Sequence, residues 1–253
     1  MNKEIVALQL FSIRNHLSNG YKEAVMKISS MGYQGVELAG DYGGMTAFEL
    51  KEFLGECRLK VIGAHVSFEE LMNQLDQVID FHKEIGNQYI VCPYAPLEAE
   101  DDFRGILDDL NRIGEQCRKS DLLFGYHNHA AEFKSFRGHA GFDILLKGTD
   151  PDLVFFELDT SWMQVGGHDP VDYCEKYPGR FKLSHIRDYK INENRKIIPQ
   201  AIGNGIMDFH RIIPSLEKNG CHYLIVELGT NDFESVEASF RNIIKILKRN
   251  NTF

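Results

Sequence analysis

The sequence predicts one closed barrel of eight parallel strands, each followed by a helix, which is the α/β class called the (β/α)8 or TIM barrel. Amphipathic stretches with apolar residues three and four positions apart, such as 68–85 and 233–248, separate short apolar runs. Strands that alternate with helices form a parallel sheet, and eight such units close into a barrel. The eight runs begin near Ile5, Gly35, Val61, Tyr89, Leu122, Val154, Phe181 and Tyr223.

The junctions before several of these runs share one pattern. At Gly32, Gly86 and Gly220 an amphipathic stretch ends and an apolar run follows within a few residues, as where a helix passes into a strand. No Gly-, Ser- or Pro-rich linker divides the chain, so we expect residues 1–253 to form a single domain. The polar segment 188–204 is long, and loops of this length often cover an active site.

Composition and charge exclude several classes of protein. The chain has 253 residues, of which 43% are hydrophobic, enough to bury a large core. The formal net charge of -9 argues against a nucleic-acid partner, because such proteins need clustered Lys and Arg. The 5 cysteines are scattered without a CxxC pair, as expected for reduced thiols in a cytoplasmic protein. No segment approaches the ~20 apolar residues of a membrane span, and the amino terminus lacks a signal-peptide pattern.

Three of the apolar runs lead directly to a side chain that can bind a metal ion. The run from Val154 leads to Asp159, the run from Phe181 to His185, and the run from Tyr223 to Glu227. The carboxyl ends of parallel strands meet at one rim of a barrel, where active sites are built. Histidine and carboxylate ligands together suit Mn, Zn, Co or Fe better than Ca. We therefore predict a divalent metal site at this rim.

A fourth ligand is expected from the region of the fifth strand, where His127, His129 and Glu132 lie close together in the sequence. Side chains alternate along a strand, so His127 and His129 share one face. Glu132 follows shortly after, and a short loop could fold it back toward the metal. The residues themselves leave the choice among the three open.

Short motifs along the whole chain resemble the sugar phosphate isomerase/epimerase family, within the xylose isomerase-like TIM-barrel superfamily. This superfamily includes ketose 3-epimerases, inosose dehydratases, hydroxypyruvate isomerases and endonuclease IV. The motifs are 8–14 (LQLFSIR), 35–38 (GVEL), 126–129 (YHNH) with Glu132-Phe133, Leu158-Asp159-Thr160, 185–188 (HIRD) and Gly203-Asn204-Gly205.

The resemblance implies a metal set of Glu, Asp, His and Glu from the last four strands. Asp159, His185 and Glu227 match three of these ligands directly. In the ketose epimerases a Glu ends the fifth strand, whereas this sequence has His127 there. We predict Glu132 as the first ligand because it restores three carboxylates and one His, with His127 as the alternative. This departure argues against simple ketose 3-epimerisation.

The resemblance further implies an enzyme that acts on a sugar, keto-sugar or cyclitol through an enediolate. A divalent metal (Mn, Zn, Co or Mg) would bind the substrate oxygens and acidify the neighbouring C–H group. The base would be His127, His129, Glu132 or Glu227. Returning the proton gives isomerisation or epimerisation, and loss of a β-substituent would make the protein a dehydratase or lyase.

The substrate is expected to be a small carbohydrate held by Glu37, His65, Trp162 and Arg187. No Gly-rich phosphate loop follows the last two strands, which favours an unphosphorylated substrate. An endonuclease IV-like nuclease is disfavoured by the acidic charge, and because Trp162 stands where that group has a further His ligand. A sugar-binding barrel without catalysis is a third hypothesis, and self-association into a homo-oligomer is compatible with all three.

Overall fold

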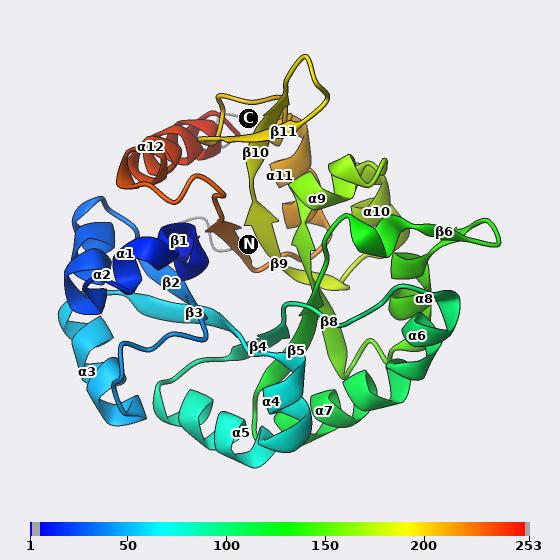
Figure 1. Ribbon diagram of the computed structural model, residues 1–253, viewed down its shortest axis with the longest axis horizontal. Helices are drawn as coiled ribbons and strands as arrows, with labels where there is room; N and C mark the ends of the chain where they lie inside the picture. The colour runs from blue at the N-terminus through cyan, green and yellow to red at the C-terminus, as the bar shows by residue number, and fades with distance from the viewer. Residues whose placement is uncertain (2–5, 251–253) are drawn as a thin grey trace.

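Eight parallel strands close into a barrel in the order β1-β12-β9-β8-β5-β4-β3-β2 (Figure 1), so the fold class predicted from the sequence is confirmed. The computed structural model describes residue 1 and residues 6–250. The predicted start of the first strand at Ile5 lies outside the described residues. The strands are β1 (Val6–Gln9), β2 (Gly35–Ala39), β3 (Lys60–His65), β4 (Tyr89–Cys92), β5 (Leu123–His127), β8 (Val154–Asp159), β9 (Phe181–Ile186) and β12 (Tyr223–Val226).

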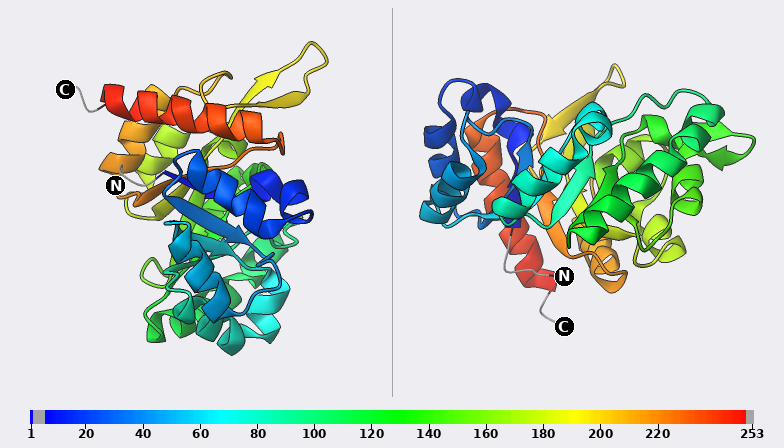
Figure 2. Two further views of the ribbon diagram at one scale, coloured as in Figure 1. Left: turned by 90° about the vertical axis from the view of Figure 1, so that its left-hand side faces the viewer. Right: turned by 90° about the horizontal axis from the view of Figure 1, so that it is seen from below.

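Helices surround the barrel and cover the outer face of its strands (Figures 1 and 2). The longer ones are α2 (Tyr21–Ser30), α3 (Ala47–Glu56), α5 (Leu75–Glu84), α7 (Leu107–Lys119), α8 (Gly141–Gly148), α10 (Pro170–Lys176), α11 (Phe209–Lys218) and α12 (Phe233–Asn250). Shorter turns are η1 (Leu10–Ile13), α1 (Arg14–Leu17), α4 (Phe68–Asn73), α6 (Glu100–Gly105), η2 (Ala131–Phe133) and α9 (Thr160–Val165). No helix of the described chain is long and apolar enough to cross a membrane.

One of the two helices expected from the sequence is interrupted. The stretch 68–85 forms α4 and α5, which are separated at Gln74, where φ is -137° and therefore not helical. A capping box between Ser67 and Glu70 starts α4. The other expected helix, 233–248, corresponds to α12 as one continuous helix.

Two small hairpins project from the barrel. The hairpin β6 (Ser135–Phe136) with β7 (His139–Ala140) precedes α8, and β10 (Asp188–Ile191) pairs with β11 (Ile197–Gln200) in antiparallel fashion. The segment expected to be a long polar loop is therefore largely this second hairpin. Both views in Figure 2 place it at the opposite end of the barrel from the carboxyl end of α12.

The loop that carries Gly203-Asn204-Gly205 is folded around the buried carboxylate of Asp188. Oδ2 of Asp188 accepts hydrogen bonds from the backbone N–H groups of Gly203 (2.9 Å) and Gly205 (2.8 Å). Oδ1 accepts from Met207 (3.1 Å) and Tyr189 (2.9 Å). A Cβ atom at residue 205 would collide with Asp188 Oδ1, so this position requires glycine. This motif therefore has a structural explanation.

The interior of the barrel consists of two layers. Residues two apart on a strand point to the same side, so Leu183 and His185 on β9 both face inward. The apolar layer, nearer the amino ends of the strands, consists of Ala7, Ile62, Tyr89, Val91, Phe155, Leu183 and Ile225. The polar layer, nearer the carboxyl ends, consists of Gln9, Glu37, His65, His127, Glu157, Asp159, His185 and Glu227.

Candidate active site

Four neighbouring strand ends bring together four side chains that can bind a metal ion. His127 ends β5, Asp159 ends β8, His185 lies near the end of β9, and Glu227 directly follows β12. Each offers one ligand atom, and these atoms all lie within 4.8 Å of one another. All four residues are nearly or fully removed from solvent by the barrel walls. These residues, hereafter the donor set, occupy the rim where the sequence predicts a metal site.

Glu132 lies outside the donor set. Its Oε1 accepts a hydrogen bond from the Tyr126 hydroxyl (2.9 Å), and its Oε2 accepts from the backbone N–H of His129 (2.8 Å). Tyr126 and His127 are neighbours on β5 and point to opposite faces of the barrel wall. The hydrogen bonds to Tyr126 and His129 engage both carboxylate oxygens of Glu132, and the group of closely spaced ligand atoms contains His127 and not Glu132.

Glu157 is a residue of the site that the sequence analysis missed. Its fully buried Oε2 lies 2.7 Å from His65 Nε2, 3.0 Å from His127 Nδ1 and 3.2 Å from His185 Nε2. These four residues form a second group of closely spaced ligand atoms, deeper in the barrel. The signal in the sequence was an acid within the apolar run, two positions before Asp159 and therefore on the same face of β8.

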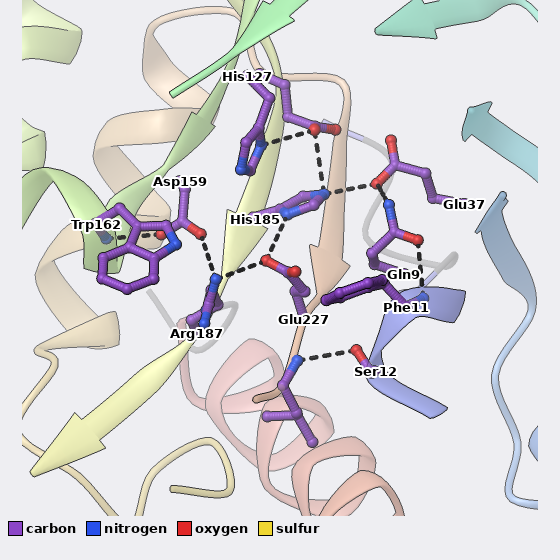
Figure 3. A network of polar contacts seen from close by, with 12 residues as sticks. Gln9, Phe11, Ser12, Glu37, His127, Asp159, Trp162, His185, Arg187 and Glu227 are labelled. Carbon is purple, nitrogen blue, oxygen red and sulfur yellow. Dashed lines mark hydrogen bonds and ion pairs between the residues drawn. The ribbon is translucent and has the colours of Figure 1, made fainter. Parts of the chain in front are cut away.

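Glu37, which the sequence analysis assigned to substrate binding, is buried below the pocket. Its Oε2 accepts a hydrogen bond from Gln9 Nε2 (2.7 Å) and lies 2.6 Å from His185 Nε2 (Figure 3). Burial, and then the neighbouring Glu157 carboxylate, raise the pKa of Glu37 to about 7. The side chain has no exposed surface, and Oε2 also lies 3.5 Å from His65 Nε2, so Glu37 contacts Gln9, His65 and His185.

Arg187 and Trp162 lie beside the donor set. Arg187 Nη1 donates to Glu227 Oε2 at 2.9 Å and lies 3.4 Å from Asp159 Oδ2. The guanidinium also lies 4.8 Å from the centroid of the Trp162 ring. Asp159 Oδ1 accepts from the Trp162 backbone N–H at 2.8 Å and so caps α9. The start of this helix therefore places the indole next to Arg187 and the donor set (Figure 3).

The electrostatic environment keeps several of these groups in states that suit a metal ligand. Burial lowers the pKa of His127 to about 3, so its imidazole is neutral. Burial alone would raise the pKa of Glu227, but Arg187 and His185 outweigh it and hold that pKa well below the ordinary value. Metal ions bind neutral imidazoles and ionised carboxylates.

A pocket of about 340 Å³ opens above the donor set. Phe11 and Tyr94 form exposed aromatic walls, and among the described lining residues none is Lys or Arg. The pocket is lined by Phe11, Ala39, Gly40, His65, Ser67, Glu70, Pro93, Tyr94, His127, His129 and Glu227. A larger hollow of about 550 Å³, between α6, the β6–β7 hairpin and α8, lies on the outside of the barrel. The pocket above the donor set suits a small polar molecule with an apolar face.

His129 is placed at the pocket by the segment that follows β5. Its ring centroid lies 4.9 Å from that of His127 and 6.1 Å from that of Trp162. Burial lowers the pKa of His129, so the ring is neutral and can accept a proton. The hydrogen bond from its backbone N–H to Glu132 fixes the chain at this point.

The charges of the polar layer fit a divalent cation. Four buried carboxylates meet there, from Glu37, Glu157, Asp159 and Glu227, and Arg187 contacts only the last two. One oxygen of Glu37 and one of Glu157 have no hydrogen-bond partner in the described structure. Buried anions are stable only when cations or hydrogen bonds compensate them. Two imidazoles and two carboxylates form a ligand set that suits Zn, Mn or Co.

The fold and this polar layer define a TIM barrel with a candidate metal centre at the carboxyl ends of its strands. Residues 25–249 match the family described as Xylose isomerase-like TIM barrel, and the chain belongs to this family of enzymes. The family membership inferred from the sequence motifs is therefore confirmed.

Known proteins similar to this chain include both isomerases and dehydratases. Inosose dehydratase from Clostridium beijerinckii is 23% identical over 247 residues, with 83% of this chain and 82% of that protein covered. The crystal structure of a sugar phosphate isomerase/epimerase from Parabacteroides distasonis is 30% identical, with a TM-score of 0.80 and coverage of 94% and 93%. The IOLI protein, solved with a binding zinc atom, shares the fold, with a TM-score of 0.76, 11% identity and coverage of 98% and 100%.

Proposed function

We propose that the protein is a divalent-metal-dependent isomerase or epimerase of a sugar, keto-sugar or cyclitol. It would remove a proton from the carbon next to a carbonyl group and return it after an enediolate has formed. The observation that carries this proposal is the donor set, four ligand atoms within 4.8 Å of one another beneath an open pocket. The similar sugar phosphate isomerase/epimerase supports the reaction class.

The donor set of His127, Asp159, His185 and Glu227 would hold the ion. Mn, Zn or Co suits two imidazoles and two carboxylates, and Mg is a further candidate for the carboxylates. When bound, such an ion polarises the carbonyl and makes the adjacent C–H group more acidic. The zinc atom bound by the IOLI protein supports a metal in this fold.

We assign proton transfer to His129 and Glu227, which both line the pocket. The neutral His129 imidazole can accept a proton from the substrate carbon, and Glu227 is a carboxylate that can receive or return one. Glu132 is not a base in this assignment. Its carboxylate holds the backbone of His129 and so orients the imidazole toward the pocket.

The walls of the pocket favour an unphosphorylated substrate. Its described lining residues contain two acids, Glu70 and Glu227, and no Lys or Arg. Arg187 is already paired with Asp159 and Glu227, so it has less capacity to bind a phosphate group. Kinetics on matched free and phosphorylated sugars test this point. A phosphorylated substrate with kcat/KM more than about tenfold higher, a preference of ~1.4 kcal/mol, would contradict it if Arg187→Ala abolished the preference.

A dehydratase is the second candidate, because an inosose dehydratase is among the similar proteins. The first step would be the same removal of a proton next to a carbonyl. His129 at the pocket could then donate its proton to a departing hydroxyl group, because imidazole gains and loses protons near neutral pH. An unsaturated product detected by ultraviolet absorbance or mass spectrometry would distinguish elimination from isomerisation.

Deuterium uptake from heavy water into candidate keto-sugars and inososes tests both reactions, with Mn added to the protein. We expect exchange at the carbon next to the carbonyl, and its loss in Asp159→Ala. The matched control is Asp143→Asn, a buried carboxylate held by Lys176 and Tyr177 outside the barrel. Folded wild-type protein that binds Mn but exchanges no deuterium into any of these compounds would contradict the proposal.

A further inference from the structure

Two buried carboxylates of the polar layer, Glu37 and Glu157, lie beneath the donor set and contact its histidines. We propose that they are positioning residues that fix opposite tautomers of the two histidines. His185 would then present Nδ1 to the ion, and His127 would present Nε2. This inference rests on the proposed metal site and concerns how the chain prepares it.

The tautomer of His185 follows from a chain of hydrogen bonds that begins on β1. The backbone N–H of Phe11 donates to Gln9 Oε1 (3.2 Å), which turns Gln9 Nε2 toward Glu37. Gln9 Nε2 donates to Glu37 Oε2 (2.7 Å), so this oxygen is an acceptor. His185 Nε2 lies 2.6 Å from the same oxygen and must therefore carry a proton. In the neutral imidazole that a metal ion binds, the lone pair of His185 therefore lies on Nδ1.

The other side of the His185 ring is arranged for a cation. Nδ1 lies 3.1 Å from Glu227 Oε2, and this oxygen already accepts a hydrogen bond from Arg187 (2.9 Å). Two electron donors that face each other need a proton or a metal cation between them, and a bound metal ion would take the place of the Nδ1 proton. His185 Nδ1 and Glu227 Oε2 are therefore two electron donors directed at one point.

The tautomer of His127 is fixed by Glu157. An ionised carboxylate only accepts hydrogen bonds, so the ring nitrogens that face it carry protons. His127 Nδ1 lies 3.0 Å from Glu157 Oε2, which leaves the lone pair of His127 on Nε2. Figure 3 shows this second nitrogen without a dashed contact. Metal-binding histidines commonly donate their other ring N–H to a carboxylate in this way.

Glu157 Oε2 also lies 3.2 Å from His185 Nε2, so Glu157→Gln should disturb both rings, whereas Glu37→Gln should disturb His185 alone. Loss of such a carboxylate partner typically lowers metal affinity by about 10- to 100-fold without removing a ligand. The deeper group of His65, His127, Glu157 and His185 offers a competing arrangement, in which an ion would take His127 Nδ1 and His185 Nε2 instead. The two arrangements of the metal ion differ in which ring nitrogens of His127 and His185 carry protons.

Long-range proton–nitrogen NMR of the zinc-loaded protein, labelled with 15N at histidine, tests the inference directly. We expect a proton on His127 Nδ1 and on His185 Nε2, and zinc-shifted signals from the other two nitrogens. Zinc on His127 Nδ1 or His185 Nε2 would overturn the inference but leave the proposed function standing. Wild-type protein that binds no zinc, measured on the same sample, would instead remove the metal site on which the proposed function depends.

Glu157→Gln and Glu37→Gln provide the second test, with zinc affinity measured by calorimetry. We expect each to bind zinc about 10- to 100-fold more weakly, and Glu157→Asp to recover part of the loss. Asp143→Asn should bind zinc as tightly as the wild type. Folded glutamine variants with unchanged affinity and unchanged tautomers would overturn the inference.

A milder variant covers the case in which the glutamine variants do not fold. Gln9→Met removes the donor to Glu37 but retains the volume and both carboxylates. It should weaken zinc binding several-fold, less than Glu37→Gln, and shift the protonation of His185 without affecting His127. Equal effects on both rings would show that the two histidines are not positioned separately, which contradicts the inference.

Discussion

The two layers inside the barrel are built on the same strands and have opposite physical character. On β9 Leu183 belongs to the apolar layer and His185 to the polar layer, and on β8 Phe155 precedes Glu157 by two positions. Burial of each large apolar side chain stabilises the fold by roughly 1.5–3 kcal/mol. Burial of charged groups stabilises only where partners compensate them. Positions two residues apart on one strand therefore belong to different layers. The apolar layer stabilises the barrel, and the polar layer carries the candidate metal ligands.

The largest expected effect is on the polar layer. Asp159→Ala removes a ligand, so metal affinity should fall by more than the about 100-fold that loss of a supporting partner causes. The metal-free variant should lose only about 1 kcal/mol of stability, from the missing helix cap. Calorimetric titration with zinc measures the metal affinity. Unfolding by urea in the absence of metal measures the stability. If Asp159→Ala instead lowered the stability of the metal-free protein strongly, the polar layer would also be needed to stabilise the barrel.

Phe155→Ala makes the converse change in the apolar layer. We expect the free energy of unfolding to fall by about 3–5 kcal/mol, because a buried aromatic ring is replaced by a cavity. Metal affinity of the folded fraction should stay near the wild-type value, since the Phe155 ring packs against Tyr89 and Gly125 in the apolar layer. Denaturant unfolding and metal titration of one preparation measure both. A large loss of metal affinity would argue against the division into layers.

His82 offers a buried imidazole outside the barrel for comparison with those of the polar layer. Its Nδ1 faces the Asn87 side-chain amide (3.2 Å), and burial lowers its pKa to about 4, although Glu70 opposes the shift. Burial also lowers the pKa of His185, but Glu157 and Glu37 outweigh it and raise that pKa. The nearby carboxylates therefore decide the direction in which the pKa of a buried histidine shifts.

Protonation of His82 predicts a pH dependence of stability. The unfolded chain, with a histidine pKa of about 6.5, binds a proton before the folded protein does as the pH falls. The free energy of unfolding is therefore unaffected by His82 above about pH 6.5 and decreases as the pH falls toward about 4. At about pH 5 this decrease amounts to roughly 2 kcal/mol. Urea unfolding at about pH 7.5 and about pH 5 should show a smaller decrease for His82→Gln. An equal decrease in both proteins would assign the effect to other groups.

A further comparison concerns Asp188, a buried carboxylate that accepts four backbone hydrogen bonds and lies outside the donor set. Asp188→Asn turns one acceptor oxygen into an NH2 group that faces backbone N–H groups of the 203–207 loop. We expect a loss of about 1–3 kcal/mol in stability, with metal affinity unchanged. Thermal unfolding with and without zinc measures it. A change in metal affinity would mean that this loop also positions the donor set.

The positions of the barrel strands could be predicted because strands buried on both faces leave continuous apolar runs. The break at Gln74 could not, because the residues on both sides follow one helical pattern. Asp159, His185 and Glu227 were predicted to lie together because strand ends meet at one rim, and the structure brings them together. The prediction of Glu132 as a ligand remains untested, and no sequence pattern shows that its carboxylate accepts hydrogen bonds from the Tyr126 hydroxyl and the His129 backbone.

Asp188 joins the start of the β10–β11 hairpin to the loop after its end, so one side chain closes the whole segment at its base. We therefore expect changes of length or sequence between these anchors to leave the barrel fold intact. Pro199 of β11 and Arg187 both lie against Gly229, next to the donor set. The base of the hairpin therefore adjoins the donor set through Pro199, although no residue of β10 or β11 is among the described residues that line the pocket.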